Sequence, residues 1–425
     1  MITSLNLRFV LLLVLIILAC YSHADPVLGR GQIDVTKNEF ENLSCDGVTD
    51  DAHKIQRLID IAPATADSVF VIPSQRTCVF TGRIFLRSNL TFKFHGGAAF
   101  AGGSWVYVSR SENSGDGPRN VRWIDCNFIN KGKYITRTHV LIRAANVTFE
   151  RCVWNRVFRK DTHVIDVGGS ENIIINDNTF IGSHGDIRLA NDITKEAVQV
   201  DYAWMLGMKI PESDLKASGT GLHVYNNAPS RNIVVRNSRF VPSYNPDGSI
   251  ESYPPPPFGV HATTSECLRN LRMCIGDVRF EGNVVLDVVD VGVQRRNQGI
   301  IHFGLQGKIN ISGNTFQNIH THNDYMVSVE VPDGKLDSVS IDVDKNRFMW
   351  SDPRVAVILI REGVALAKSE HLERMVRICD NDFYIDRLKG LPRLIDGHDR
   401  DAKIRRSDCG NRFSGLSHAP RVPRK

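Results

Sequence analysis

Nine copies of one pattern follow residue 119, and they constrain the fold more than any other feature of the chain. Each copy has a run of alternating apolar residues, then a small polar residue, then an aromatic or aliphatic residue. The copies are residues 120–128, 146–154, 172–180, 232–240, 277–285, 308–316, 340–348, 376–383 and 404–413. Most copies end 26 to 35 residues apart, with longer intervals of 45 and 60. Such a chain buries its apolar residues by stacking one repeat on the next.

The repeats predict an all-β solenoid. Each unit holds two or three short strand-like segments separated by Asn, Gly, Asp or Ser, with no helical pattern between them. Leucine-rich and ankyrin repeats need a helix or their own signature in each unit, and a propeller needs four strands per roughly 40–45 residues. A parallel β-helix fits, because stacked strands close most sheet edges and leave two open ends. The 60-residue interval is expected to contain a further turn.

Asparagine recurs near the start of several repeats, at Asn146, Asn172 and Asn232. This residue tolerates the left-handed backbone conformation that tight turns require. We expect each side-chain amide to bond to its copy in the next turn. These asparagines are therefore interpreted as structural.

A single amphipathic helix is expected near the N-terminus. Thr49, Asp50 and Asp51 precede apolar residues at helical spacing, which predicts an N-capped helix of about three turns. The helix would seal one end of the solenoid, and residues 68–73 would form a strand of the first turn. The predicted organisation is one domain over residues 25–425, with a cap at about 45–65, repeats at about 68–415 and a tail at 416–425.

The segments CDGVTDDAHKIQRLID (45–60) and VFVIPSQRTCVFTGRIFL (69–86), together with the repeats, resemble the pectate-lyase-like right-handed parallel β-helix superfamily. The resemblance implies the right-handed form of the fold. The superfamily includes pectate lyases, polygalacturonases, alginate epimerases and lyases, and phage tailspikes. Its motif identifies a fold and not a reaction. The NTDG and GHG segments of polygalacturonases and the YGFDPH motif of mannuronan epimerases are absent, and residues 161–163 share only a D-x-H spacing with the latter.

The N-terminus predicts export. Arg8 precedes eleven apolar residues, too few for the roughly 20 that span a bilayer but enough for a signal peptide. Small residues at Ser22 and Ala24 favour cleavage before Asp25, and a lipoprotein site at Cys20 is the alternative. The expected location is periplasmic or extracellular, with no membrane-spanning segment in the mature chain.

The mature chain would keep eight cysteines, an even number that suits an oxidising compartment. They form no CxxC pair or Cys/His cluster, so no metal site is predicted. Stacking of equivalent repeat positions predicts the disulfides Cys126–Cys152 and Cys379–Cys409, and buried free thiols are the alternative because the geometry between adjacent strands often does not suit a disulfide. The pairs Cys267–Cys274 and Cys45–Cys78 are expected to close a local loop and to tie the cap to the first turn.

Polar residues alternate with apolar residues in several predicted strands, and the polar side chains are expected to point outward. The resulting band contains Asp166, Gln199, Asp201, His223, Tyr225, His261, His302 and Glu330. Equivalent strands lie about 4.8 Å apart, so such a band would suit an extended polymer. A register slip of one residue would turn all of these side chains inward. The segment at 196–201, EAVQVD, also resembles a KEAIQ-type segment of carbohydrate-processing members of the superfamily.

Two reaction mechanisms remain open. A uronate lyase needs a base and positive charge near the carboxylate of the sugar, whereas a hydrolase needs two carboxylates roughly 5–10 Å apart. The catalytic candidates are Asp166, Asp201, His223 and His261. The substrate-binding candidates are Arg188, Lys195, Glu196, Gln199, Trp204, Tyr225, His302 and Glu330. Insertions at 203–220 and 241–258 are expected to form walls, the second with Tyr244, Tyr253 and Phe258 available to stack on sugar rings.

The favoured function is that of an exported lyase that cleaves an acidic polysaccharide by β-elimination. Hydrolysis or epimerisation on the same scaffold, or non-catalytic carbohydrate binding and adhesion, are the alternatives. The formal net charge of only +5, without a long basic run, argues against nucleic acid as a partner. No cofactor is specified by the sequence, and a role for Ca²⁺ stays open.

Overall fold

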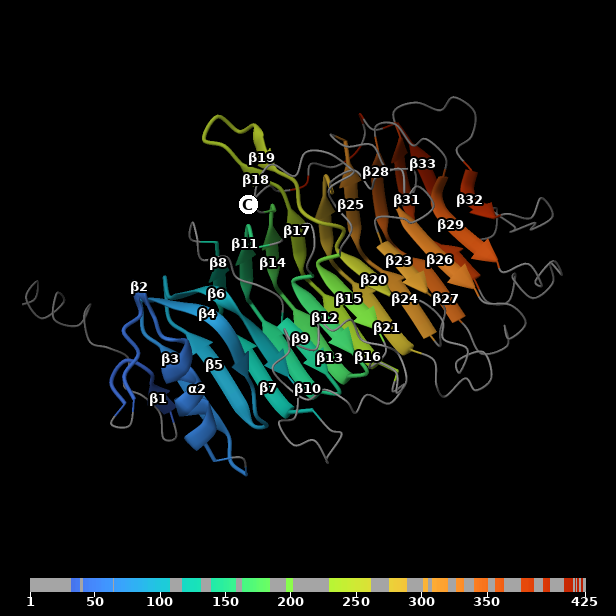
Figure 1. Cartoon of the computed structure of the whole chain (residues 1–425). Coiled ribbons are helices and arrows are strands. Elements are labelled where there is room, and N and C mark those ends of the chain that lie inside the picture. The colour runs from blue at the N-terminus through green and yellow to red at the C-terminus, as the bar shows by residue number, and fades with distance from the viewer. Residues whose placement is uncertain are drawn as a thin grey trace, which may run out of the picture.

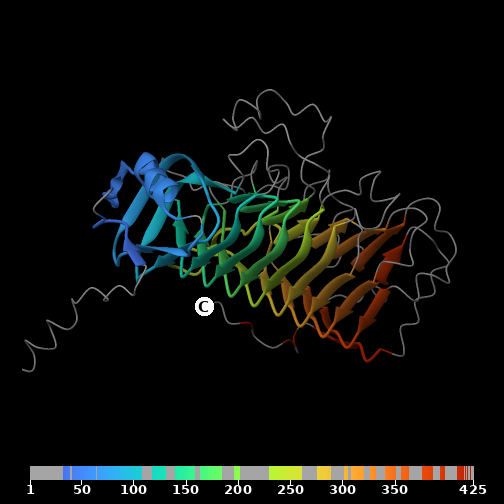
Figure 2. The same ribbon diagram turned by 90° about the horizontal axis from the view of Figure 1, so that it is seen from below.

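The chain is an all-β parallel β-helix in the computed structural model (Figure 1). The structure describes residues 32–38, 41–63, 65–107, 117–130, 139–157, 163–183, 196–201, 229–260, 275–288, 301–304, 308–319, 326–331, 340–350, 356–362, 376–385, 393–397 and 409–415, with Ser417, Ala419 and Val422. In Figure 2 the turns follow one another along the solenoid from blue to red. The fold predicted from the repeats is confirmed.

Three parallel sheets run along the solenoid, and each turn contributes one strand to each sheet. The first sheet consists of β1 (Gln32–Asp34), β3 (Ser68–Ile72), β5 (Leu90–Phe94), β7 (Arg119–Ile124), β10 (Ala145–Glu150), β13 (Glu171–Asn176), β16 (Arg231–Arg236), β21 (Gly276–Glu281), β24 (Lys308–Ser312), β27 (Ser340–Asp344) and β30 (Val376–Cys379). The second sheet consists of β8 (Asn127–Ile129), β11 (Val153–Asn155), β14 (Thr179–Ile181), β17 (Arg239–Val241), β22 (Val284–Leu286), β25 (Thr315–Asn318), β28 (Arg347–Trp350), β31 (Asp382–Ile385) and β33 (Arg412–Ser414).

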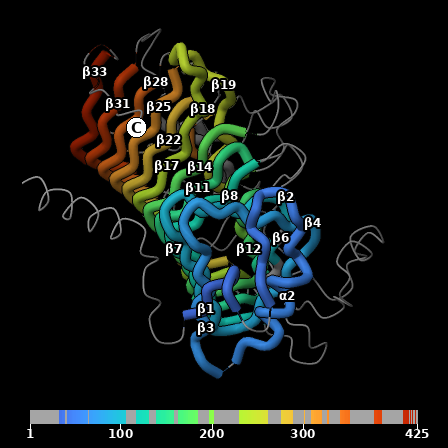
Figure 3. The backbone as a smooth tube through the Cα atoms, turned by 90° about the vertical axis from the view of Figure 1, so that its left-hand side faces the viewer, coloured from blue at the N-terminus to red at the C-terminus, as the bar shows by residue number. Residues whose placement is uncertain are grey.

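The third sheet consists of β9 (His139–Ile142), β12 (Ile165–Gly168), β15 (Val198–Asp201), β20 (Phe258–Val260), β23 (Ile301–Gly304), β26 (Val327–Val331), β29 (Ala356–Glu362) and β32 (Arg393–Gly397). At the N-terminal end, β2 (Asp46–Asp50) pairs with the long strand β4 (Thr77–Phe85), which pairs with β6 (Ala99–Tyr107). Strand β6 pairs with both β8 and β9 and so joins the second and third sheets. Figure 3 looks at the N-terminal end of this coil.

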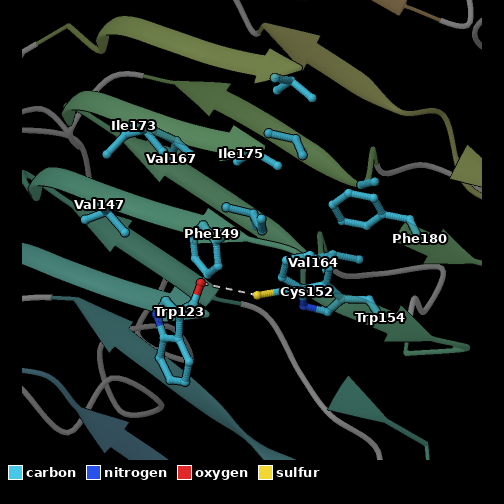
Figure 4. Packing of buried hydrophobic residues seen from close by; sticks show 14 of the residues in the cluster. Trp123, Val147, Phe149, Cys152, Trp154, Val164, Val167, Ile173, Ile175 and Phe180 are labelled. Carbon is cyan, nitrogen blue, oxygen red and sulfur yellow. Dashed lines mark hydrogen bonds between the residues drawn. The ribbon is translucent and has the colours of Figure 1, made fainter. Parts of the chain in front are cut away.

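Each of the first eight repeats covers one strand of the first sheet and the next strand of the second, and the described part of the last repeat contains β33. The final residue of each of the first eight repeats points into the core, and Phe413 of the last repeat is 46% exposed. Rings of successive turns stack with centres 4.6 to 5.3 Å apart in the two longest series. These series are Phe128–Trp154–Phe180–Phe240 and Phe316–Phe348–Phe383–Phe413. Figure 4 shows Trp154 and Phe180 of this stack beside the aliphatic residues of the first sheet. The repeat is therefore the sequence signature of a continuous apolar core.

Asparagines form two ladders at the corners of the coil. On the surface, Asn120, Asn146, Asn172 and Asn232 have φ between 52° and 59°, and each amide donates to the side-chain oxygen of the preceding turn over 2.8 to 3.0 Å. This ladder confirms the role expected for Asn146, Asn172 and Asn232. A second, buried ladder lies between the first and second sheets and contains Asn283, Asn314, Asn346, Asn381 and Asn411.

The 60-residue interval contains no further turn, contrary to expectation. Strand β13 pairs directly with β16, and Asn232 bonds to Asn172. Strands β14 and β15 complete the turn between them, and residues 202–228, outside the described part of the chain, account for most of the extra length. Interval length alone does not distinguish an inserted segment from an added turn.

The expected helix is α2 (Ala52–Ile61), which buries Ile55, Leu58 and Ile59. Its N-terminal amide at Ala52 is capped by the side chain of Asp50, while Asp51 turns inward and accepts from the backbone amides of residues 44 and 45. Asp46 accepts from the amides of residues 48 and 49, and these hydrogen bonds lower its pKa to about 2. The aspartates of the GVTDD segment therefore have structural roles.

Two of the expected disulfides are present, Cys45–Cys78 and Cys379–Cys409. The expected bond Cys126–Cys152 is absent, and both thiols are buried and free. These cysteines occupy the corner position that asparagine takes in later turns, and each thiol points to a carbonyl of the preceding turn. The thiol of Cys152 contacts the Trp123 oxygen at 3.5 Å (Figure 4). Cys267 and Cys274 lie outside the described residues.

We expect alkylation of the unfolded, unreduced protein to label Cys126 and Cys152 but not Cys45, Cys78, Cys379 or Cys409. Both thiols are buried, so both cysteines should resist labelling until the protein unfolds, and burial also raises the pKa of the Cys126 thiol. Peptide mass mapping after labelling in denaturant checks the result, with the native protein as control. Recovery of a peptide pair linked through Cys126 and Cys152 would contradict the assignment.

Candidate functional site

Two strands of the third sheet carry the best-described polar cluster. Asp166 lies in β12 beside Gln199 of β15, and Asp201 lies two residues further along β15, beside Gly168. The intervening valines, Val167, Val198 and Val200, have no exposed surface and point into the core. Asp166 and Asp201 are half-buried on the outer face. The alternation assumed for these two strands is confirmed.

The cluster is fixed by a hydrogen bond between neighbouring outer side chains. The amide Nε2 of Gln199 donates to Oδ2 of Asp201 over 3.0 Å. Gln199 is only 6% exposed, although its position in the strand faces outward. Two residues along the strand and one strand across place the Cα atoms of Asp166 and Asp201 about 8 Å apart. We call Asp166 and Asp201 the carboxylate pair.

The polar positions form two columns across the third sheet and not one. Asp166 and Gln199 pair in register, followed by Gly259 and His302 in the next two turns. Glu330 is in register with Gly304, so it belongs to the second column, which begins with Asp201. His302 and Glu330 are assigned to these columns from the register of their strands. Glycine occupies positions 259 and 304 between the two groups of polar positions, and Gly259 is buried.

Glu196 is buried completely and does not belong to the outer surface. It lies at the corner before β15, where Ala197 and Val198 both face the core and strict alternation breaks down. Its backbone oxygen contacts Nδ1 of His163 at 3.0 Å, and its carboxylate lies 3.7 Å from the same nitrogen. The predicted contact between Glu196 and substrate is therefore corrected to a buried contact with His163.

The insertion at 241–258 differs from the expected aromatic wall. Strands β18 (Ser243–Tyr244) and β19 (Ile250–Ser252) form a hairpin there. The hairpin is fixed to an earlier turn because Arg156 donates to Glu251 over 2.5 Å. Phe258 has no exposed surface and points into the core, so it does not stack on a sugar, and residues 254–257 are buried as well. Tyr244 and Tyr253 remain half-exposed.

Several predicted residues lie outside the described part of the chain. They are the catalytic candidates His223 and His261, the binding candidates Arg188, Lys195, Trp204 and Tyr225, and the insertion at 203–220. The site that the structure describes therefore consists of the carboxylate pair and Gln199.

One buried titratable residue was not singled out in the sequence. His139 of β9 lies inside the coil, with ring centres of Phe128, Trp123 and Phe149 within 4.7 to 5.2 Å. Burial lowers its pKa to about 3. Its position at the start of an apolar segment, residues 139–142, is the signal that predicts an inward residue. His139 is part of the core and not of the outer surface.

The described residues contain no group of three or more His, Cys, Asp or Glu side chains arranged to hold a metal ion. Within the same part of the chain, no helix has the length and apolar character needed to cross a bilayer.

Comparison with known proteins gives structural neighbours only: no family model and no curated protein sequence matches the chain. The surface adhesin PfbA of Streptococcus pneumoniae superposes with a TM-score of 0.53 at 14% identity, over 89% of this chain and 91% of the adhesin. A double mutant of the tailspike protein of E. coli bacteriophage HK620 superposes with a TM-score of 0.48 at 12% identity, over 83% of this chain and 57% of the tailspike. At this level of identity, the adhesin supports the fold alone.

Proposed function

We propose that this chain is an exported protein that binds and cleaves an extended polysaccharide on the outer face of its third sheet. The observation that carries the proposal is the carboxylate pair, two acids on adjacent strands with Gln199 bonded to one of them. The flat run of parallel strands suits a linear polymer.

Hydrolysis is the reaction that the carboxylate pair supports best. With Cα atoms about 8 Å apart, the two side chains can hold their carboxyl groups at the separation of roughly 6.5–9.5 Å that leaves room for a water molecule in inverting glycosidases. One carboxyl group would protonate the leaving oxygen, and the other would activate the water on the opposite face of the sugar. The hydrogen bond from Gln199 stabilises the charged form of Asp201, which suits Asp201 as the base and Asp166 as the acid.

β-Elimination on an acidic polysaccharide is the second candidate. The register of His302 with Gly259 supports it, because His302 falls in the column that contains Asp166 and Gln199. An imidazole there would be two turns from Gln199, within the reach of a polymer that spans several sugar units. The histidines at 223 and 261 remain candidate bases in this proposal.

Export also belongs to the proposal. The apolar segment before Ser22 and Ala24 favours a signal peptide, and two disulfides suit an oxidising compartment. The pneumococcal adhesin is named for a surface location, which is compatible with the proposed export.

The test is turnover of the mature protein on a panel of neutral and uronate polysaccharides. We expect new reducing ends, with ultraviolet absorbance of an unsaturated sugar appearing only if the reaction is elimination. The variants Asp166→Asn and Asp201→Asn should each lower turnover about 10²–10⁴-fold, because each removes a proton-transfer group. Their free energies of unfolding should stay within about 0.5 kcal/mol of the parent value.

The matched control is Asp177→Asn, an exposed aspartate at a turn of the same region with φ 55°, a conformation that Asn accepts. It should leave turnover unchanged. Full activity of both Asp166→Asn and Asp201→Asn would place the chemistry elsewhere. Binding that both variants weaken, without turnover on any substrate of the panel, would favour the adhesion alternative.

A further inference from the structure

Arginines on the outer face of the first sheet are neutralised near both of its ends. Arg119 pairs with Glu171 at 3.3 Å, and Arg122 lies 3.8 Å from Glu150. Further along the solenoid, Arg377 pairs with Asp342 at 2.9 Å. These pairs link neighbouring turns and add little net charge to the face.

The middle of the same sheet differs. Arg231 and Arg236 of β16, Arg279 of β21 and Lys308 of β24 are all exposed, and we call them the central cationic patch. Arg236 donates to the side-chain oxygen of Asn176 over 2.9 Å, and Arg279 donates to that of Asn232 over 3.3 Å. Among the described residues, no carboxylate lies within ion-pair distance of any of the four.

Two acids belong to these strands but leave the patch positive. Glu281 is in register with Arg236, and Asp277 comes one residue before Val278, which is in register with Ile309. On the preceding strand, Glu171 is in register with Arg231 but pairs with Arg119. The three strands therefore carry four cations against these two acids on this face. The bonds to asparagine orient the two guanidinium groups without neutralising them.

We propose that the central cationic patch is a second, non-catalytic binding surface for an acidic polysaccharide. The backbone beneath it is part of a rigid sheet, so binding orders little more than the side chains themselves. Guanidinium groups bind carboxylates and sulfates through paired hydrogen bonds, and strands about 4.8 Å apart present them along an extended chain. The surface lies on a different sheet from the carboxylate pair (Figure 1). The inference takes its ligand class from the proposed function but does not depend on turnover.

The test compares two triple variants that each remove three positive charges from the same sheet face. Arg231→Gln, Arg236→Gln and Arg279→Gln together remove most of the patch, whereas Arg119→Gln, Arg122→Gln and Arg377→Gln remove paired arginines. The probes are immobilised polygalacturonate and alginate, at low and at physiological salt. An exposed charge contact contributes roughly 0.5 kcal/mol, so the patch variant should bind about tenfold more weakly and the control less than about threefold.

The background of the assay is the double variant Asp166→Asn and Asp201→Asn, so that cleavage cannot mask binding. If the patch variant loses affinity while the parent protein turns over no glycan, the binding role of the patch would be supported and the proposed cleavage activity would be rejected. If both triple variants bound the polyuronates equally weakly, the loss of affinity would come from net charge alone, and the proposal would be overturned. Absence of polyuronate binding by the background protein, or tighter binding to single-stranded DNA than to polyuronate, would also overturn it.

Discussion

Replacing Asn346 by alanine should lower the free energy of unfolding by about 3–5 kcal/mol, because the substitution leaves several buried polar groups without partners. The Asn346 oxygen accepts from the backbone and side-chain amides of Asn314, both at 2.9 Å. Its own amide donates to the Ile311 oxygen at 2.8 Å and to Asn381 at 3.1 Å. With the side chain 1% exposed, water cannot replace these bonds without opening the coil. Denaturant unfolding followed by circular dichroism measures the change.

The surface ladder supplies the control. Asn146→Ala breaks equivalent amide bonds at an exposed corner, where water replaces them, but it also places alanine at φ 56°. We expect a loss of about 1–2 kcal/mol, most of it from the left-handed conformation. If Asn346→Ala destabilised the protein no more than Asn146→Ala, the buried ladder would have no special role in stability.

Acid should destabilise the protein through His139. The unfolded chain takes up a proton below about pH 6.5, whereas the folded chain, with the imidazole pKa lowered to about 3, takes it up only in strong acid. The unfolded state therefore binds more protons between these values, and the free energy of unfolding falls as the pH falls. The expected slope is about 1.4 kcal/mol per pH unit, over the range between the two pKa values.

His139→Leu should remove this slope, since leucine keeps an apolar side chain at the core position. Free energies of unfolding at about pH 7, pH 6 and pH 5 measure it, with the exposed His53→Gln on α2 as the control that should keep the slope. An unchanged slope in His139→Leu would mean that the acid sensitivity comes from other groups.

The fold was predictable from the sequence because one stacked unit repeats nine times. The residue that ends each repeat is aromatic in every copy except 277–285, and in most copies an asparagine lies two residues before it, as in Asn314 and Phe316. These two positions indicate the core and the buried corner directly. The positions of Asp166 and Asp201 were predictable for a related reason. They lie inside strands, where side chains alternate strictly between the two faces.

The errors have other causes. Glu196 and Phe258 lie two residues before the core residues Val198 and Val260, so alternation places both inward. Glu196 was assigned to the substrate because of its charge, and Phe258 was assigned to a wall because of its place in an insertion. Cys126 and Cys152 looked like a disulfide because they stack. Their corner position, however, is the one that asparagine fills in later turns, which directs each thiol to a carbonyl. Insertions have no periodicity, so the residues between 202 and 228 could not be placed from the pattern.

The buried ladder makes each turn depend on the turn that follows it. In each rung from Asn283 onward, the backbone amide of one asparagine donates to the side-chain oxygen of the next one along the chain. The side-chain amide of the same residue donates back to a carbonyl of the preceding turn. Removal of any turn would therefore leave groups in both of its neighbours without their hydrogen bonds.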